Sequence, residues 1–191
     1  FLTVDKKYKY SKDLHKFYSK IYIFLLRIIE KILIFFFCKK KYHQSLNIFT
    51  TFSKKKISSY SADLINIHWI NRSMISLKEM NTFKEKIVIS LHDMWFFSPT
   101  EHYFAKKNYH TDFVSKYCWV QKKNFIYKKN VFFIAHNNWM IKKFKESHPI
   151  LKKKIFLSKY YPINTKIFKP RNKNFLRKKY NIPLNKKVIF F

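Results

Sequence analysis

Three histidines in this sequence stand where short apolar runs stop. His68 ends the run LINIH, His92 follows IVISL, and His136 follows VFFIA. An imidazole can exchange a proton near neutral pH and can hydrogen-bond a hydroxyl, so these side chains suit acid–base catalysis or the orientation of a substrate. A single histidine after a strand is more often structural, whereas three at neighbouring strand ends favour a shared site.

His92 is the strongest single candidate because Asp93 follows it directly. The imidazole could orient a substrate hydroxyl, and the neighbouring carboxylate could act as a base or hold that hydroxyl. A structural role for His92 is the alternative that the residues alone leave open.

The elements that would position these side chains alternate along the chain. We predict strands over 64–69, 87–92, 131–135, 155–160 and 187–191, and helices over 76–83, 138–146 and 175–180. Ser76 opens the first of these helices and Glu79 completes a capping box. This alternation predicts an α/β fold, a parallel sheet with helices on both faces. Ligands of such folds lie beyond the carboxyl ends of the strands, where the three histidines fall.

Two other segments carry information about the fold. About 25 residues after His92 are polar and aromatic, which is too long for an ordinary connection, so we expect a functional or partly helical segment. Residues 12–37 are the most apolar stretch of the chain. The charges within it make a membrane span unfavourable, at roughly 2.5–3.5 kcal/mol for each one near a helix centre. They are Lys20, Arg27, Glu30 and Lys31.

We therefore predict an amphipathic helix in the 12–37 region. It would either pack on the core or lie at a membrane surface beside the basic run Lys39–Lys41.

The composition limits the classes of function. The chain of 191 residues has 47% hydrophobic and 20% aromatic residues, which is typical of a globular protein. Its 41 Lys and Arg against 10 Asp and Glu give a formal charge of +31, which favours anionic partners such as nucleic acid, anionic lipid or a phosphorylated substrate. Lys, Asn, Ile, Phe and Tyr are enriched together, so a compositional bias is the main explanation for this charge.

The numbers of glycine and cysteine residues exclude further kinds of binding site and fold. The sequence contains no Gly, which excludes a Walker loop and a glycine-rich dinucleotide-binding fingerprint from these residues. Its two cysteines, Cys38 and Cys118, do not make a disulfide framework, and a four-ligand zinc site would need histidines as well. This usage fits a reducing compartment, so we expect a cytoplasmic protein.

Several motifs resemble glycosyltransferase family 4, and within it the group that acts in exopolysaccharide and lipopolysaccharide assembly. The segments are ADLINIHWINRSMISLKEM, KIVISLHDMWFFSPTEHY, FFIAHNNWM, YYPINTKIFKP and NIPLNKKVIFF, and their order and spacing agree with the family over residues 46–191. LHDMW with the EHY that follows it is the most specific of them. The FKP loop is common across the family, and the His-Trp pair is a weaker signal.

The resemblance implies a GT-B enzyme with two Rossmann-like domains and an active site in the cleft between them. Members retain the anomeric configuration, need no metal or other cofactor, and transfer a sugar from a nucleotide-diphosphate sugar to a hydroxyl. By motif match, His92 would contact the donor sugar as a catalytic residue together with Asp93, and Asp93 and Trp95 would shape the acceptor side. Acceptor contact or support of the cleft is implied for His68, Trp69, His102, Tyr103 and Asn138, while Trp139 matches the motif but suits packing better.

The family pattern also differs from this chain at informative places. Relatives usually have Gly after the HWIN segment, where this chain has Arg72 and Ser73, and they often have several cysteines where only Cys118 remains. We expect residues 1–180 to form the acceptor-side domain, incomplete at its N-terminus, and residues 181–191 to be the first strand of a truncated donor-binding domain. Such a piece would be inactive alone.

The expected partners follow from this assignment. They are a nucleotide sugar, a glycan or lipid-linked acceptor, and an anionic membrane surface on the inner face, with no specific nucleic acid. Two alternatives stay open: a basic nucleic-acid-binding module that uses Lys39–Lys41, Lys54–Lys56 and Lys152–Lys154, or a translated fragment without function.

Overall fold

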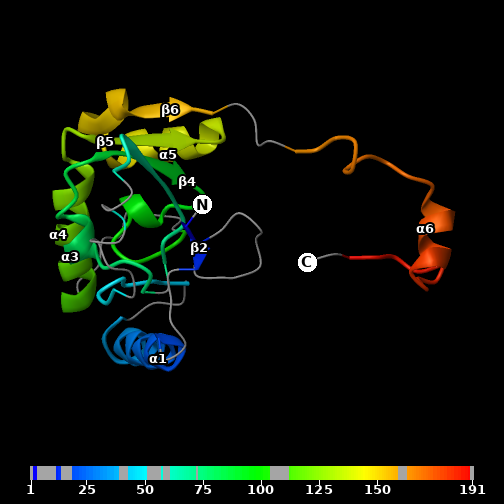
Figure 1. The fold of residues 1–191 in the computed structure, drawn as a ribbon, viewed down its shortest axis with the longest axis horizontal. Coiled ribbons are helices and arrows are strands. Elements are labelled where there is room, and N and C mark those ends of the chain that lie inside the picture. Colours follow the sequence, from blue (N-terminus) through cyan, green and yellow to red (C-terminus); the bar gives the residue numbers. More distant parts are fainter. Residues whose placement is uncertain are drawn as a thin grey trace. The chain divides into compact units, whose positions relative to one another are not determined.

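The computed structural model describes residues 2–3, 12–13, 19–38, 43–50, 57, 61–71, 73–103, 112–158 and 163–189 (Figure 1). The chain divides into two compact units, Phe1–Lys159 and Tyr160–Phe191. This division falls between Lys159 and Tyr160, before the expected domain boundary at 180/181, and the assignment of 181–191 to a following domain stays a prediction.

The first unit is built on a four-stranded sheet in the order β3 (Leu64–His68), β4 (Lys86–Leu91), β5 (Val131–Ala135) and β6 (Ile155–Leu157). All three strand pairs are parallel. The α/β fold with a parallel sheet and packed helices, of the Rossmann-like kind, is therefore confirmed. A separate parallel pair consists of β1 (Leu2–Thr3) and β2 (Lys12–Asp13).

The helices of the first unit lie between and before these strands. They are α1 (Ser19–Phe37), α3 (Leu77–Met80), α4 (Phe113–Ile126) and α5 (Asn138–Ser147), with short 3-10 turns at η1 (Trp95–Phe97) and η2 (Pro149–Lys154). The predicted opening of α3 is confirmed, because the Ser76 side chain accepts a hydrogen bond from the Glu79 N–H. Asp112 caps α4 and Asn137 caps α5 in the same way.

The two faces of the sheet are covered unequally. Ile87, Ile89 and Phe133 are fully buried, whereas Phe132 and Ile134, which point to the other face, are only half-buried. The strand order follows the chain order, and right-handed connections then carry α3, α4 and α5 over the same face. The ring contact of Phe133 with Phe144 of α5 (4.6 Å between centroids) identifies that face as the buried one.

Helix α1 lies at the end of the unit opposite β6 (Figure 1) and confirms the predicted helix in the 12–37 region. Its inner side buries Ile23 and Leu26, together with the carboxylate of Glu30. Glu30 Oε1 accepts hydrogen bonds from the backbone N–H groups of Leu46 and Asn47, and its Oε2 accepts one from the Ser73 hydroxyl. This buried charge fixes α1 to two separate segments of the chain.

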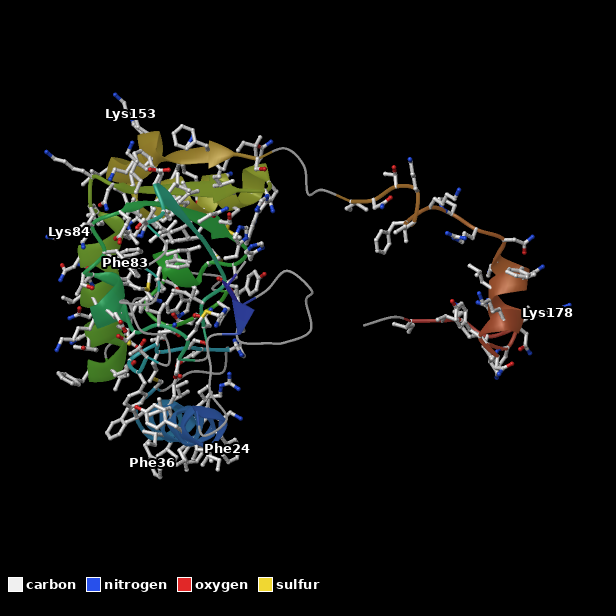
Figure 2. All side chains as sticks on the ribbon, viewed as in Figure 1. Phe24, Phe36, Phe83, Lys84, Lys153 and Lys178 are labelled. Carbon is white, nitrogen blue, oxygen red and sulfur yellow. The ribbon has the colours of Figure 1, made fainter. Side chains whose placement is uncertain are left out.

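The outer side of α1 is apolar as well. Phe24 and Phe36 extend away from the body of the unit (Figure 2), and they are 62% and 71% exposed. Other exposed apolar residues of this side are Ile21, Tyr22, Leu25, Ile29, Ile32, Phe35 and Phe37. No helix among the described residues is long and apolar enough to span a membrane.

The second unit contains α6 (Lys173–Lys179), which Asn172 caps and which agrees with the helix predicted near 175–180. Arg177 donates hydrogen bonds to the backbone carbonyls of Pro183, Leu184 and Lys186, and so folds the segment after α6 back as a turn. The strand predicted over 187–191 is not formed at 187–189, and residues 190–191 lie outside the described residues.

Candidate functional site at the carboxyl edge of the sheet

The carboxyl ends of three neighbouring strands bring three histidines together. His68 is the last residue of β3, and His92 and His136 directly follow β4 and β5. His68 Nδ1 lies 2.9 Å from His92 Nε2, and the ring centroids of His92 and His136 are 5.6 Å apart. The structure therefore assembles the cluster that the sequence pattern predicts.

A chain of hydrogen bonds continues from His68 into the sheet. The Ser90 hydroxyl donates to Asn66 Oδ1 (3.2 Å) and lies 3.4 Å from His68 Nε2. Ser90 has one hydroxyl proton, and it goes to Asn66. His68 Nε2 therefore carries the proton in the contact with Ser90. The Nδ1 of His68 is then unprotonated and accepts from His92 Nε2. In this assignment of tautomers, Nδ1 is the acceptor nitrogen of the His92 ring.

The electrostatics of the cluster favour neutral rings. Burial lowers the pKa of His92, and the neighbouring His68 and His136 lower it further, while Asp93 opposes them. Burial also lowers the pKa of His136, with a smaller contribution from His68. Neutral imidazoles at physiological pH are the form that binds hydroxyls or accepts protons.

Asp93 lies beside His92 in sequence but faces the protein. Its Oδ1 accepts the backbone N–H of Trp95 at 2.9 Å, and its Oδ2 lies 2.5 Å from His102 Nδ1. The other ring nitrogen of His102, Nε2, lies 2.9 Å from the Ser45 hydroxyl. Both carboxylate oxygens are thus engaged, and Asp93 is a positioning residue for the turn after β4 in this arrangement.

The motif residues Trp95 and His102 belong to the same internal network. Trp95 is fully buried and its indole N–H donates to the Ser45 carbonyl at 2.7 Å, while only 5% of His102 is exposed. The segments around residues 43–45 and 100–102 hold this network through backbone hydrogen bonds and the antiparallel bridge Gln44–Glu101. For His102, support of the cleft fits better than acceptor contact. Trp95, which was expected to shape the acceptor side, has no exposed surface for direct contact with a substrate in this arrangement.

The remaining predicted residues lie at the surface. Trp69 and Tyr103 are 41% and 54% exposed, and Trp69 has a φ of 36°, a left-handed conformation that costs an L-residue about 1–2 kcal/mol. Trp69 directly follows His68, so this strained residue borders the histidine cluster. Asn138 is the exposed first residue of α5, whose cap is Asn137. Trp139, expected to pack, is 50% exposed.

Sequence reasoning missed one supporting residue, Lys122 of α4. This lysine is fully buried, and its ammonium donates to the backbone carbonyls of Trp95, Ser98 and Pro99 at 2.7–3.0 Å. It also lies 3.6 Å from the Trp95 ring, and burial lowers its pKa to about 7. The available signal was its spacing, since Lys122 continues the buried stripe of Val114 and Cys118 at four-residue intervals.

Metal and thiol chemistry find little support in this part of the molecule. Among the described residues, no group of three His, Cys, Asp or Glu side chains is arranged to hold a metal ion. Cys38 and Cys118 are buried free thiols, and burial raises their pKa values to about 11 and about 12, so neither is an activated nucleophile.

Comparisons of the chain with protein-family models, with curated proteins and with solved structures gave no match.

Proposed function

We propose that this chain supplies the acceptor-side half of a retaining glycosyltransferase, which moves a sugar from a nucleotide-diphosphate sugar to a glycan or a lipid-linked acceptor. The observation that carries the proposal is the meeting of His68, His92 and His136 at the carboxyl edge of a parallel sheet, where ligands of such folds bind. The resemblance of the LHDMW and EHY segments to glycosyltransferase family 4 supplies the reaction class.

In this proposal His92 contacts the donor sugar or the acceptor hydroxyl at the reaction centre. Its neutral ring and the hydrogen bond from His92 to His68 suit it to orient a hydroxyl without adding charge to the site. Trp69 and Tyr103 offer exposed rings for acceptor contact. Asp93 acts through the turn that carries His92, because both of its oxygens bond within the protein.

The nucleotide of the donor would bind mainly to a second domain, so residues 1–191 alone are expected to be inactive. We also propose a cytoplasmic protein that binds peripherally to an anionic inner membrane face. Two features support this placement: the exposed apolar side of α1 and the formal charge of +31.

The test begins with the coding sequence downstream of residue 191. A second α/β pattern with an acidic pair is expected there, and an unrelated sequence would contradict the proposal. With that segment included, His92→Ala should lower kcat/KM for sugar transfer by about a hundredfold or more. Lys145→Ala, at an exposed position of α5, is the control. Unchanged transfer by the His92 variant would remove His92 from the mechanism.

A further inference from the structure

A cavity of about 560 Å³ lies between α1 and residues 43–45, outside the histidine cluster. Its wall has an apolar part, which includes Phe24, Ile28 and Ile34, and a polar part, which includes Lys31 and Gln44. This division suits a ligand that is itself part apolar and part polar.

Gln44 is the residue that marks the cavity as a binding site. Only 8% of it is exposed, and among the described residues neither Oε1 nor Nε2 of its side chain has a hydrogen-bond partner. Its backbone is held at the cavity by the antiparallel bridge to Glu101. A buried amide without partners is costly, and a ligand oxygen that accepts a hydrogen bond from Nε2 would lower that cost.

The charge of the wall favours an anion. Arg27 and Lys31 lie one turn apart on α1 and both line the cavity. Glu30 lines it too, but both of its oxygens accept hydrogen bonds from Leu46, Asn47 and Ser73 on the protein side. Two cations against one internally bonded carboxylate leave the wall with a net charge of +1.

The apolar part of the wall continues onto the surface. Phe24 and Ile28 line the cavity and are also 62% and 37% exposed. Phe24 extends from the outer apolar side of α1 (Figure 2). A ligand whose polar end meets Gln44 would therefore extend its apolar part along the side of α1 that faces away from the body of the unit.

We propose that this cavity binds the uncapped phosphate monoester headgroup of an anionic membrane lipid, with Arg27 and Lys31 on the phosphate and the Gln44 amide as a further donor. The lipid tails would remain in the bilayer against Phe24 and Ile28. The inference deepens the membrane part of the proposed function and depends on it, but it is independent of sugar transfer.

The test uses the full 191-residue chain and vesicles of phosphatidylcholine, with and without phosphatidic acid. Sedimentation should show tighter binding to the acidic vesicles. Gln44→Leu and Lys31→Gln should each weaken that binding about fivefold and leave binding to neutral vesicles unchanged. Lys145→Gln removes the same charge from α5 and should have a much smaller effect, and far-ultraviolet circular dichroism checks folding.

Three results would overturn the inference. Equal weakening by Lys31→Gln and Lys145→Gln, with no effect of Gln44→Leu, would mean general charge attraction on a membrane-binding protein. Absence of binding to either kind of vesicle would remove the membrane placement as well.

In a parallel experiment, inorganic phosphate should raise the melting temperature of the wild-type chain and of Gln44→Leu equally. Stabilisation that requires Gln44, without lipid selectivity, would assign the cavity to free phosphate.

Discussion

His92 and Asp93 are adjacent in sequence but occupy different surroundings. His92 faces the strand edge and shares a hydrogen bond with His68, whereas Asp93 turns inward to the Trp95 N–H and to His102. The two residues therefore have different tasks. The His92 side chain can contact a ligand, and the Asp93 side chain holds the backbone turn that positions His92. Lys122 also supports this turn, because its ammonium donates to the backbone carbonyls of Trp95 and Ser98.

The lowered pKa values of His92 and His136 predict a pH dependence of folding. The stability that these neutral rings contribute is complete above the unfolded histidine pKa of about 6.5, and it is lost as the pH falls through their lower folded values. The double variant His92→Gln, His136→Gln should therefore lose less unfolding free energy than wild type between pH 7.5 and pH 5. Urea denaturation at each pH measures this, with Lys145→Gln as a control that should keep the wild-type slope.

At the scale of elements, α1 shows how one buried charge decides the orientation of a helix. A helix with apolar residues on both its inner and its outer side has no inner face fixed by hydrophobicity alone. Glu30 fixes it, because its carboxylate accepts hydrogen bonds from the segments around Leu46 and Ser73. Burial of Ile23 and Leu26 follows on that side, and the other apolar residues remain outside. The exposed apolar side of α1 is thus a consequence of the position at which the Glu30 carboxylate finds its hydrogen-bond donors.

Substitution of Glu30 tests this account. Glu30→Leu leaves the N–H groups of Leu46 and Asn47 without their acceptor, which should cost about 2–4 kcal/mol of unfolding free energy. Glu30→Gln keeps a carbonyl oxygen for both N–H groups and should cost about 1 kcal/mol. Urea denaturation measures both values, and hydrogen exchange should accelerate at Leu46 and Asn47 in the Leu variant alone. Equal costs would contradict the account.

Much of the element order could be predicted from the sequence because it depends on local patterns. The strand over Val131–Ala135 and the helix that begins at Asn138 match the structure, since an apolar β-branched run and an amphipathic stretch leave little choice. Helix α4 was expected only as a partly helical segment. Lys122 places a charged residue type at a buried position of this helix, and the three carbonyls that accept from Lys122 are visible only in the folded chain.

The candidate site was predictable only in part. That the histidines meet follows from parallel strands, which the alternation indicates. The pairing of Asp93 with His102 was not predictable, because it depends on residues 43–45 returning beside residues 100–102. Ser73 has a left-handed backbone (φ 57°), a conformation that glycine adopts most easily, and a chain without glycine must place other residues at such positions.

At the scale of the whole molecule, stability is concentrated in the first unit. The buried apolar cluster runs from Cys38 to Ile155 and includes no residue of Tyr160–Phe191. The second unit has its own local order around α6 and Arg177. Its removal should therefore leave the core of the first unit intact.

A chain that ends after Lys159 should keep the unfolding free energy of the full chain within about 0.5 kcal/mol, because the described residues of the buried apolar cluster all belong to the first unit. A chain that ends after Glu146 loses β6 with the core residue Ile155 and should not show a cooperative transition. Thermal denaturation followed by circular dichroism distinguishes these outcomes, and a large loss in the longer chain would mean that the second unit supports the core.

The tryptophans give this protein a built-in optical probe of its candidate site. Trp69 and Trp139 are 41% and 50% exposed and follow His68 and His136 closely in sequence, whereas Trp95 has no exposed surface. A soluble quencher such as iodide therefore reaches Trp69 and Trp139 and not Trp95, provided that the fourth tryptophan, the partly exposed Trp119 of α4, is replaced by Phe. Emission at long wavelength reports on the strand edge, and emission at short wavelength reports on the core, so ligand arrival and loss of folding can be followed separately without a label.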